Sequence, residues 1–312
     1  MTPFTVASMV GKVIEVPGEL AVSQEKFNGE AGRAFVAQLP ERAEEFLRRW
    51  ELRVEGPAMY GMCALVLPVV RPEGAPAALK LQPLDEESAG EPEALRVWDG
   101  DGAVRLLEHD EATCTLLLER LDEGRSLDGV PDSREAVRVI GGLLARLTAV
   151  PAPPGMRRLD DIARDMLERV PWALGRIPEA AVRRLVGDCA AAVREVLAEP
   201  GDRLLHWDLH FENVLAGTRA GCPPGEWLAI DPKPLAGDPG FDLLPAIDNR
   251  YDPAETRWRF DALTDALGLD RERARAWTLG RVLQNCLWEL EDNPAGRPLD
   301  AVQLEIGRAL RG

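Results

Sequence analysis

A histidine, an aspartate and an asparagine stand close together in the segment HWDLHFENVL, positions 206–215. His206, Asp208 and Asn213 have the spacing H-x-D-x-x-x-x-N, which is typical of the loop that catalyses phosphoryl transfer in kinases. In that chemistry the aspartate accepts the proton of a substrate hydroxyl, and the asparagine reaches a magnesium ion held between the phosphates of ATP. Apolar residues flank the segment on both sides. The pattern therefore predicts a catalytic loop between two short strands.

An acidic residue ends the next apolar run, WLAIDP, at positions 227–232. A carboxylate at the end of a strand is held rigidly, as a metal ligand at the floor of a cleft must be. Taken singly, an aspartate before a proline is more often a turn residue. Because Asp231 follows the H-x-D-x-x-x-x-N segment in the chain order of a kinase, the combination is much harder to obtain by chance. This combination favours Asp231 as a second metal-binding side chain beside Asn213.

A lysine interrupts an apolar run upstream, AALKL at positions 77–81. A charge on a mostly buried strand needs a partner, whereas the alternative is an ordinary lysine on an edge strand. In kinases a lysine at this place holds the phosphates of ATP and pairs with a glutamate of the next helix. The segment 87–98 is helical in its second half and offers Glu91 or Glu93 to Lys80.

Two further segments of the N-terminal part are candidates for contact with the nucleotide. Gly61, in YGMC, precedes an apolar run and could lie at the tip of a loop that covers phosphates, although a glycine near a turn is more often only a turn. Glu119 and Leu121 end another apolar run and are followed by Asp-Glu-Gly. A connector between two lobes would fall there, and its backbone amides and carbonyls could meet the edge of an adenine.

The order of expected elements divides the chain into two parts. A helix is expected at 40–50, and the short apolar runs that predict strands lie at 63–67, 77–81, 103–110 and 112–120. After the connector the pattern turns helical, with apolar stripes at 132–147, 159–170 and 178–199. We therefore expect an α+β fold with two lobes. Residues 1–121 form an antiparallel sheet that carries one helix, and residues 122–312 form a mainly helical lobe.

The composition excludes several classes of partner. Of the 312 residues 53 are acidic and 37 are basic, and the net charge of −16 argues against nucleic acid and against an anionic membrane. A cationic small molecule would be attracted, although acidic residues also serve simply to keep a protein in solution. The five cysteines contain no C-x-x-C pair, and residues 1–22 lack the pattern of a signal peptide. We expect a cytoplasmic, monomeric protein.

Three segments resemble the aminoglycoside phosphotransferase family: LHWDLHFENVL at 205–215, WLAIDPKP at 227–234 and GDPGFDLL at 237–244. Within this family the chain is most similar to the subgroup of streptomycin 6-kinases and hydroxyurea phosphotransferases. The similarity extends to 94–107 and 277–288, and so covers most of the chain from about residue 60 onward. It implies a bilobal, protein-kinase-like fold, ATP with Mg²⁺ as the phosphoryl donor, and a small-molecule hydroxyl as the acceptor.

The resemblance also implies a role for each matching residue. Asp208 would be the catalytic base, Asn213 and Asp231 the magnesium ligands, and Lys80 the phosphate-binding lysine, with Glu91 ahead of Glu93 as its partner. Pro92 requires a helix that starts beside it.

Supporting residues follow from the same resemblance. His206 would orient the loop, and Asp242 would brace its backbone from below. His210 suits either loop structure or a contact with the acceptor. Where protein kinases have D-F-G, this chain has Asp-Pro-Lys from Asp231 onward, so no movement of a phenylalanine is inferred.

The activity that we expect is ATP-dependent phosphorylation of a hydroxyl of a cationic antibiotic, with streptomycin favoured. Hydroxyurea or another small hydroxyl compound is the alternative within kinases, and a non-catalytic nucleotide-binding protein is the alternative of another class. A protein kinase is disfavoured because no A-P-E sequence follows Asp231. Acidic side chains beyond Asp242 are candidates for contact with guanidinium groups of the acceptor: Asp248, Asp252, Glu289, Glu291 and Asp292.

Overall fold

The computed structural model describes residues 14–219, 225–292 and 297–311, which fall into two compact units. The first unit contains residues 14–100, 104–121 and 217–219, and the second contains the remaining described residues. The main division follows Leu121. Short segments on either side of the division, 101–103 and 217–219, belong with the other unit in each case.

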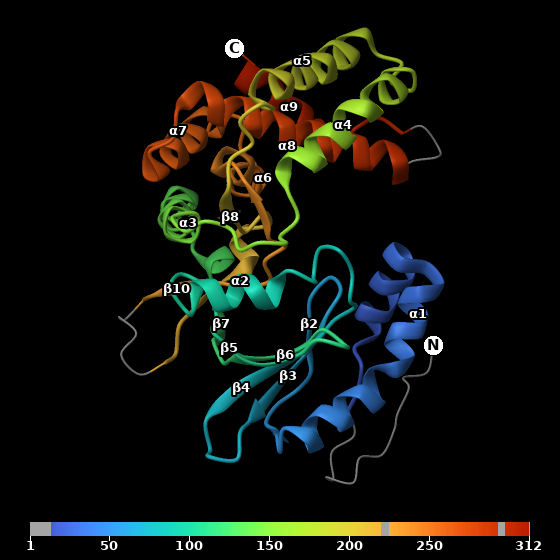
Figure 1. Cartoon of the computed structure of the whole chain (residues 1–312), viewed down its shortest axis with the longest axis vertical. Coiled ribbons are helices and arrows are strands. Elements are labelled where there is room, and N and C mark those ends of the chain that lie inside the picture. Colours follow the sequence, from blue (N-terminus) through green and yellow to red (C-terminus); the bar gives the residue numbers. More distant parts are fainter. Residues whose placement is uncertain (1–13, 220–224, 293–296, 312) are drawn as a thin grey trace. The chain divides into compact units, whose positions relative to one another are not determined.

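An antiparallel sheet forms the centre of the first unit (Figure 1). The strands run in the order β1-β3-β4-β6-β5, and β2 also pairs with β3. They are β1 (Arg53–Val54), β2 (Met59–Tyr60), β3 (Leu65–Val70), β4 (Pro76–Leu81), β5 (Leu106–Asp110) and β6 (Thr115–Glu119). The amide of Arg71 donates to the carbonyl of Ala75 across the β3–β4 turn, at 2.9 Å. Strands β3 and β4 therefore form a hairpin, which joins the runs expected as strands at 63–67 and 77–81.

Helix α1 (Gly18–Arg49) is much longer than the helix expected at 40–50. Its apolar stripe, which includes Phe35, Leu39 and Phe46, packs with buried residues of β3 and β4 in one core cluster, and Figure 1 shows the helix beside the sheet. Gly29 interrupts the helix with a non-helical backbone (φ 55°), and Pro40 lies inside it rather than at its start. The helix therefore has a real break at Gly29, whereas at Pro40 burial of the stripe overrides the local tendency to end the helix.

Helix α2 (Glu91–Trp98) is the second helix of the first unit. It starts at Glu91 with Pro92 in its first turn, where the missing N–H of a proline costs no hydrogen bond. This start agrees with the helix expected in the second half of 87–98. Glu91 itself is buried, whereas Glu93 points to solvent.

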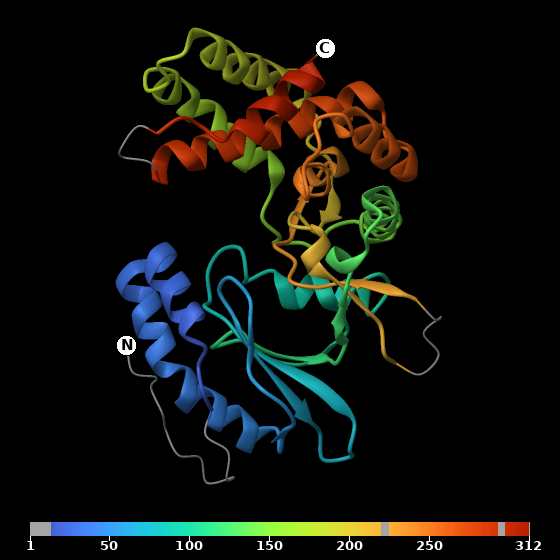
Figure 2. The ribbon, with the colours of Figure 1, turned by 180° about the vertical axis from the view of Figure 1, so that it is seen from behind.

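The second unit is mainly helical, as expected, and also contains two small antiparallel sheets, of order β10-β9-β7 and β11-β8. Its helices are α3 (Ser133–Leu147), α4 (Leu159–Leu174), α5 (Ala180–Val196), α6 (Leu244–Asp248), α7 (Thr256–Leu267), α8 (Arg271–Asp292) and α9 (Ala301–Arg311). Its strands are β7 (Asp122–Ser126), β8 (Arg203–Leu205), β9 (Val214–Ala216), β10 (Trp227–Ala229) and β11 (Leu235–Gly237). Figure 2 shows the same elements from behind.

Helix α8 supports the rest of the second unit. Gly280 lets it approach α5 closely, since a Cβ atom at that position would lie 2.9 Å from Cγ2 of Val193. The hydroxyl of Thr278 donates to the carbonyl of Gly240, at 3.0 Å, in the short 3₁₀ helix Pro239–Asp242. Helix α8 therefore fixes the segment that carries Asp242.

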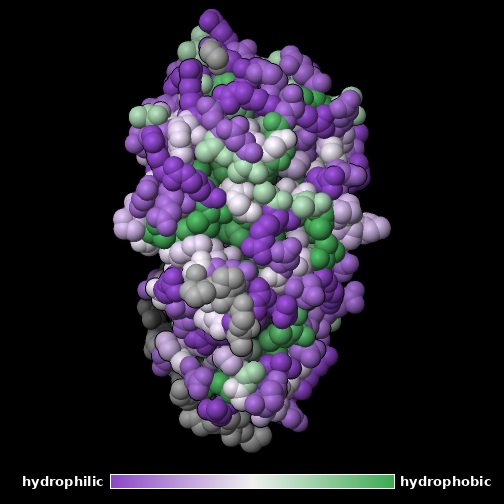
Figure 3. All heavy atoms as spheres, turned by 90° about the vertical axis from the view of Figure 1, so that its left-hand side faces the viewer, coloured by the Kyte–Doolittle hydropathy of each residue, from purple (hydrophilic) through white to green (hydrophobic). Residues whose placement is uncertain are grey.

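Within the described residues, no helix is long and apolar enough to cross a membrane. The face seen in Figure 3 is mainly hydrophilic, with small apolar patches between polar side chains. This surface agrees with a chain in which 29% of the residues are charged.

Candidate active site

Two loops of the second unit carry the three residues of the predicted phosphoryl-transfer site. Asp208 and Asn213 lie between β8 and β9, and Asp231 lies between β10 and β11. Because β8 pairs with β11 and β9 pairs with β10, the two loops leave neighbouring strand ends. They are joined by hydrogen bonds from the amide of Ile230 to the carbonyl of Asn213 (2.9 Å) and from the amide of Lys233 to the carbonyl of His206 (3.0 Å).

The side chain of Asp242 holds the first residues of the loop between β8 and β9. This side chain is fully buried, and its two carboxylate oxygens accept hydrogen bonds from the amides of His206 (2.8 Å) and Trp207 (2.6 Å). Burial raises the pKa of Asp242 to about 7, although both amide donors and the nearby Arg281 favour its charged form. The two hydrogen bonds fix the direction in which the loop leaves β8.

His206 is a neutral, fully buried side chain. Burial lowers the pKa of His206 to about 3, so the ring carries a single proton at neutral pH. Nε2 lies 3.1 Å from the carbonyl of Ile230, and Nδ1 lies 3.4 Å from the amide of Asp208. Nε2–H therefore donates to Ile230 and Nδ1 accepts from Asp208, which links both loops through one ring.

Two residues of the loops have a left-handed backbone that favours glycine. Trp207 has a φ of 68°, and Asp231 has a φ of 56°. Such a conformation costs on the order of 1 to 3 kcal/mol for a residue with a side chain, and it persists only where the surroundings fix it. For Trp207 part of that fixation is the amide hydrogen bond to Asp242.

Asp208 lies partly buried in the middle of its loop. Burial raises the pKa of its carboxyl group, whereas His210, Lys233 and Arg281 lower it. The loop is closed by the side-chain amide of Asn213, which donates to the carbonyl of Asp208 at 2.9 Å. Among the described residues the Asp208 carboxylate has no hydrogen-bond partner, so it can accept a proton from a bound hydroxyl.

Asn213 and Asp231 are chemically suited to a magnesium ion. The nitrogen of the Asn213 amide is used by the Asp208 carbonyl, which leaves its oxygen for a cation. The Asp231 carboxylate lies 3.2 Å from the ammonium group of Lys233. In the part of the chain that the structure describes, no group of three or more histidine, cysteine or acidic side chains could hold a metal. Two oxygen ligands fit Mg²⁺, which usually takes one or two carboxylates together with waters and substrate phosphates.

A pocket of about 360 Å³ opens beside the catalytic loop, and we call it the loop pocket. The titratable residues that line it are Asp208, His210, Glu212, Asp248, Arg250 and Arg281. Asp248 is fixed by the side chain of Gln303, whose amide donates to Oδ2 at 2.9 Å. Burial raises the pKa of Asp248, and Asp300 raises it further.

The five acidic residues that were expected near the acceptor differ in whether they line the loop pocket. Asp248 lines the loop pocket, whereas the other four do not. Glu289 accepts a hydrogen bond from the amide of Asp300, and Glu291 forms an ion pair with Arg169. Arg281, which was not among the residues expected from the sequence, also lines the pocket. Its only signal in the sequence is a charge inside the apolar run of α8.

Lys80 and Glu91 form a buried ion pair in the first unit. The ammonium group lies 2.7 and 2.8 Å from the two carboxylate oxygens, and the side chains are 6% and 1% exposed. Gln82 donates a further hydrogen bond to Glu91 at 2.6 Å. Glu93 instead lies 3.4 Å from Arg96 at the surface. Of the two glutamates that the sequence left open, Glu91 is therefore the partner of Lys80.

The remaining candidates of the first unit differ in what they can offer a nucleotide. The amide of Gly61 donates to the carbonyl of Ala64 (3.0 Å), which makes this segment the turn between β2 and β3. The amide of Glu119 donates to the carbonyl of Arg105 at 3.0 Å, so this amide is not available to a nucleotide. Leu121 keeps an amide that donates no hydrogen bond within the described residues.

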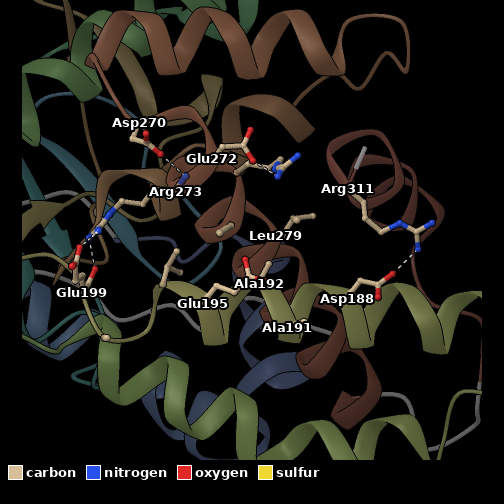
Figure 4. Close-up of a pocket in the computed structure, with 14 residues that line it drawn as sticks. Asp188, Ala191, Ala192, Glu195, Glu199, Asp270, Glu272, Arg273, Leu279 and Arg311 are labelled. Atoms are coloured by element: carbon tan, nitrogen blue, oxygen red, sulfur yellow. Dashed lines mark hydrogen bonds and ion pairs between the residues drawn. The ribbon is translucent and has the colours of Figure 1, made fainter.

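A larger hollow, which we call the helix groove, lies elsewhere in the second unit and measures about 660 Å³. Figure 4 shows its lining by α5, α8 and the end of α9. Arg311 forms an ion pair with Asp188 at 2.7 Å, and Arg273 forms one with Glu199 at 2.6 Å. None of the predicted site residues lines this groove.

The chain matches the family model described as aminoglycoside/hydroxyurea antibiotic resistance kinase over residues 49–293. It is 62% identical to a hydroxyurea phosphotransferase of Kitasatospora aureofaciens, over 96% of this chain and 88% of that protein. It is 52% identical to a streptomycin 6-kinase of Streptomyces glaucescens, over 96% of this chain and 98% of that protein.

Solved structures share the fold at low sequence identity. An aminoglycoside phosphotransferase in a ternary complex with ADP and hygromycin B has a TM-score of 0.59 at 14% identity, over 86% of this chain and 97% of that one. A choline/ethanolamine kinase family protein from Mesorhizobium loti has a TM-score of 0.58 at 15% identity, over 82% and 88%. The expected kinase-like fold is thereby confirmed, and the chain belongs to the family of aminoglycoside/hydroxyurea antibiotic resistance kinases.

Proposed function

We propose that this protein transfers the γ-phosphoryl group of ATP to a hydroxyl of streptomycin, and that Asp208 is the catalytic base. The observation that carries the proposal is the Asp208 carboxylate, which lines a pocket of about 360 Å³ and is left without a hydrogen-bond partner among the described residues. A base must lie within hydrogen-bond reach of the proton that it accepts. A hydroxyl bound in the loop pocket would meet that condition.

The neighbouring residues prepare Asp208 for this role. His206 and Asn213 hold the backbone on either side of it, and Asp242 fixes the two residues before it. Phosphoryl transfer depends almost entirely on position and on stabilisation of charge, so a rigid loop is an advantage in itself.

Asn213 and Asp231 are the residues that would hold Mg²⁺. When bound, the ion would offset negative charge on the phosphates. Lys80 would contact phosphate oxygens, with Glu91 holding its ammonium group in place. The backbone of the segment that ends at Leu121, including the amide of Leu121, is the candidate for an adenine contact.

Streptomycin is favoured as the acceptor by two independent observations. The first is the 52% identity to a streptomycin 6-kinase, which covers nearly the full length of both chains. The second is Asp248, a carboxylate in the wall of the loop pocket. Streptomycin carries guanidinium groups, and carboxylates bind guanidinium groups through paired, charge-assisted hydrogen bonds.

Hydroxyurea is a second candidate because the hydroxyurea phosphotransferase of K. aureofaciens is 62% identical to this chain. Hydroxyurea is small and neutral, so the Asp248 carboxylate gives it no charge-paired contact. The two substrates therefore differ in how their binding should respond to salt. Apparent affinity for a steered cation falls as the ionic strength rises, whereas affinity for a neutral molecule does not.

The test is a product analysis. The protein is incubated with ATP, Mg²⁺ and either streptomycin or hydroxyurea, and the products are identified by mass spectrometry and phosphorus NMR. We expect a phosphate monoester of streptomycin, with kcat/KM falling as salt is added. Phosphorylation of hydroxyurea alone would replace the first candidate by the second. ATP binding without a product from either compound would contradict both.

A further inference from the structure

Trp207 is an unusual residue to find directly before the catalytic aspartate. Its backbone is left-handed, with a φ of 68°, and its side chain is only 3% exposed. A glycine would adopt this backbone without strain, whereas a bulky side chain at positive φ is a clear outlier. The large ring must therefore contribute something that offsets the strain.

Two guanidinium groups lie over the Trp207 ring. The central carbons of Arg157 and Arg281 are each 4.7 Å from the ring centroid, which is within the range of cation–π attraction. Trp288 adds an edge-to-face contact with a centroid distance of 5.8 Å, and Arg281 also lies 5.2 Å from the Trp288 ring. The ring is thus held by residues from both the α4 side and the α8 side of the unit.

Both arginines connect the ring to other parts of the site. Arg157 donates to the carbonyl of Lys233 at 3.2 Å, close to the candidate magnesium ligand Asp231. Arg281 is 8% exposed, donates to the side chain of Gln284 one turn further along α8, and lines the loop pocket together with Asp208. A displacement of either arginine would therefore be transmitted to the backbone from which Asp208 projects.

We propose that Trp207 and Arg281 form a clamp that sets the direction of the Asp208 carboxylate, so that Arg281 is a positioning residue for phosphoryl transfer. This inference rests on the proposed function. The clamp holds the left-handed backbone of Trp207 in place and so fixes the position of Asp208. It does not take part in binding ATP. Loss of the clamp should therefore lower kcat and leave KM for ATP nearly unchanged.

The test compares Arg281→Met and Arg281→Lys with a matched control, Arg176→Met. Arg176 lies over the ring of Trp172 at 4.4 Å, in the same unit but outside the loop pocket. We expect kcat to fall about 10- to 100-fold in Arg281→Met, because small displacements of reacting groups can cost on the order of 100-fold. Arg281→Lys should recover part of the loss, since the cation over the ring is kept. Arg176→Met should match the wild type.

A second variant covers the case in which Arg281→Met does not fold. Trp207→Gly keeps the left-handed backbone without strain, removes the indole ring and leaves a cavity, so its melting temperature should fall. We expect a folded protein with the same fall in kcat and with KM for ATP within about threefold of wild type, a split that general destabilisation would not produce. Fluorine NMR of protein labelled with 5-fluorotryptophan adds a signature, since the Trp207 resonance should move in Arg281→Lys.

Different experimental results would contradict the clamp and the proposed function. A wild-type protein that phosphorylates neither acceptor contradicts the proposed function. An active wild type whose folded Trp207→Gly variant keeps kcat within twofold overturns the clamp and leaves the proposed function standing.

Discussion

The helix groove and the loop pocket of the second unit differ in volume and in whether their charged side chains already form ion pairs. The helix groove (Figure 4) measures about 660 Å³ and the loop pocket about 360 Å³. In the groove, Arg273 and Arg311 are each held by a carboxylate of the wall. In the loop pocket, the Asp208 carboxylate has no such partner among the described residues, and burial raises its pKa. The smaller pocket therefore leaves a carboxylate available to a ligand, whereas the charged groups of the groove wall that form ion pairs are already used by one another.

The largest effect is expected for Asp208→Asn, which keeps the shape of the side chain and removes the proton acceptor. We expect kcat to fall by about 10³-fold, within the range of roughly 10² to 10⁴ that general bases contribute. KM for ATP and the melting temperature should stay close to the wild-type values. Near-normal turnover of this variant would contradict the role of Asp208 as the catalytic base and leave no functional difference between the loop pocket and the helix groove.

Asp231→Asn should have the next largest effect, by weakening the hold on Mg²⁺ next to the loop pocket. We expect the Mg²⁺ concentration for half-maximal rate to rise by at least about 10-fold, the lower end of what disturbed metal sites lose. Titration of the rate with Mg²⁺ at saturating ATP measures the shift. An unchanged titration curve would assign the metal to other residues.

A smaller, substrate-specific effect is expected for Asp248→Asn. A hydrogen bond to a charged group contributes about 1.5 to 3 kcal/mol, and about 1.4 kcal/mol corresponds to a factor of ten in affinity. KM for streptomycin should therefore rise about 10-fold, while the weaker salt dependence of the variant shows that a charge was lost. Hydroxyurea, if it is phosphorylated, should be unaffected. Equal losses for both acceptors would point to a damaged pocket rather than a lost contact.

The smallest effect is expected in the groove. Glu195→Gln removes a charge from the groove wall without touching the ion pairs of Arg273 and Arg311. Both kcat and KM for each substrate should stay within about twofold of wild type, as is usual for substitutions away from a site. A change in acceptor KM would show that the larger hollow takes part in binding.

The sequence predicted most of the elements that position the site. The runs around Lys80 and after Asn213 are strands because apolar residues dominate them, and the spacing of the catalytic loop is local enough to read directly. Helix α1 was underestimated because Pro40 was taken as the start of a helix, whereas it lies inside one that is buried against the sheet. The sequence pattern therefore predicted those elements correctly whose residues all lie within one short segment.

The remaining features depend on contacts between residues far apart in the chain. Backbone amides and carbonyls of the segment that contains Glu119 and Leu121 were expected to meet the edge of an adenine, but the amide of Glu119 donates to the carbonyl of Arg105. The contact of Arg281 with Trp207 joins α8 to the catalytic loop, and no periodicity reports it. Asp248 could not be separated from the acidic residues around it until its place in the pocket wall was known.

The central claim is that Asp208 faces an acceptor hydroxyl in the loop pocket, and a crystal structure with streptomycin and a non-hydrolysable ATP analogue tests it most directly. We predict a hydroxyl oxygen of streptomycin at about 2.6 to 3.2 Å from the Asp208 carboxylate, the distance that proton transfer requires. Streptomycin bound in the helix groove, or bound in the loop pocket with every hydroxyl beyond the reach of Asp208, would contradict the claim.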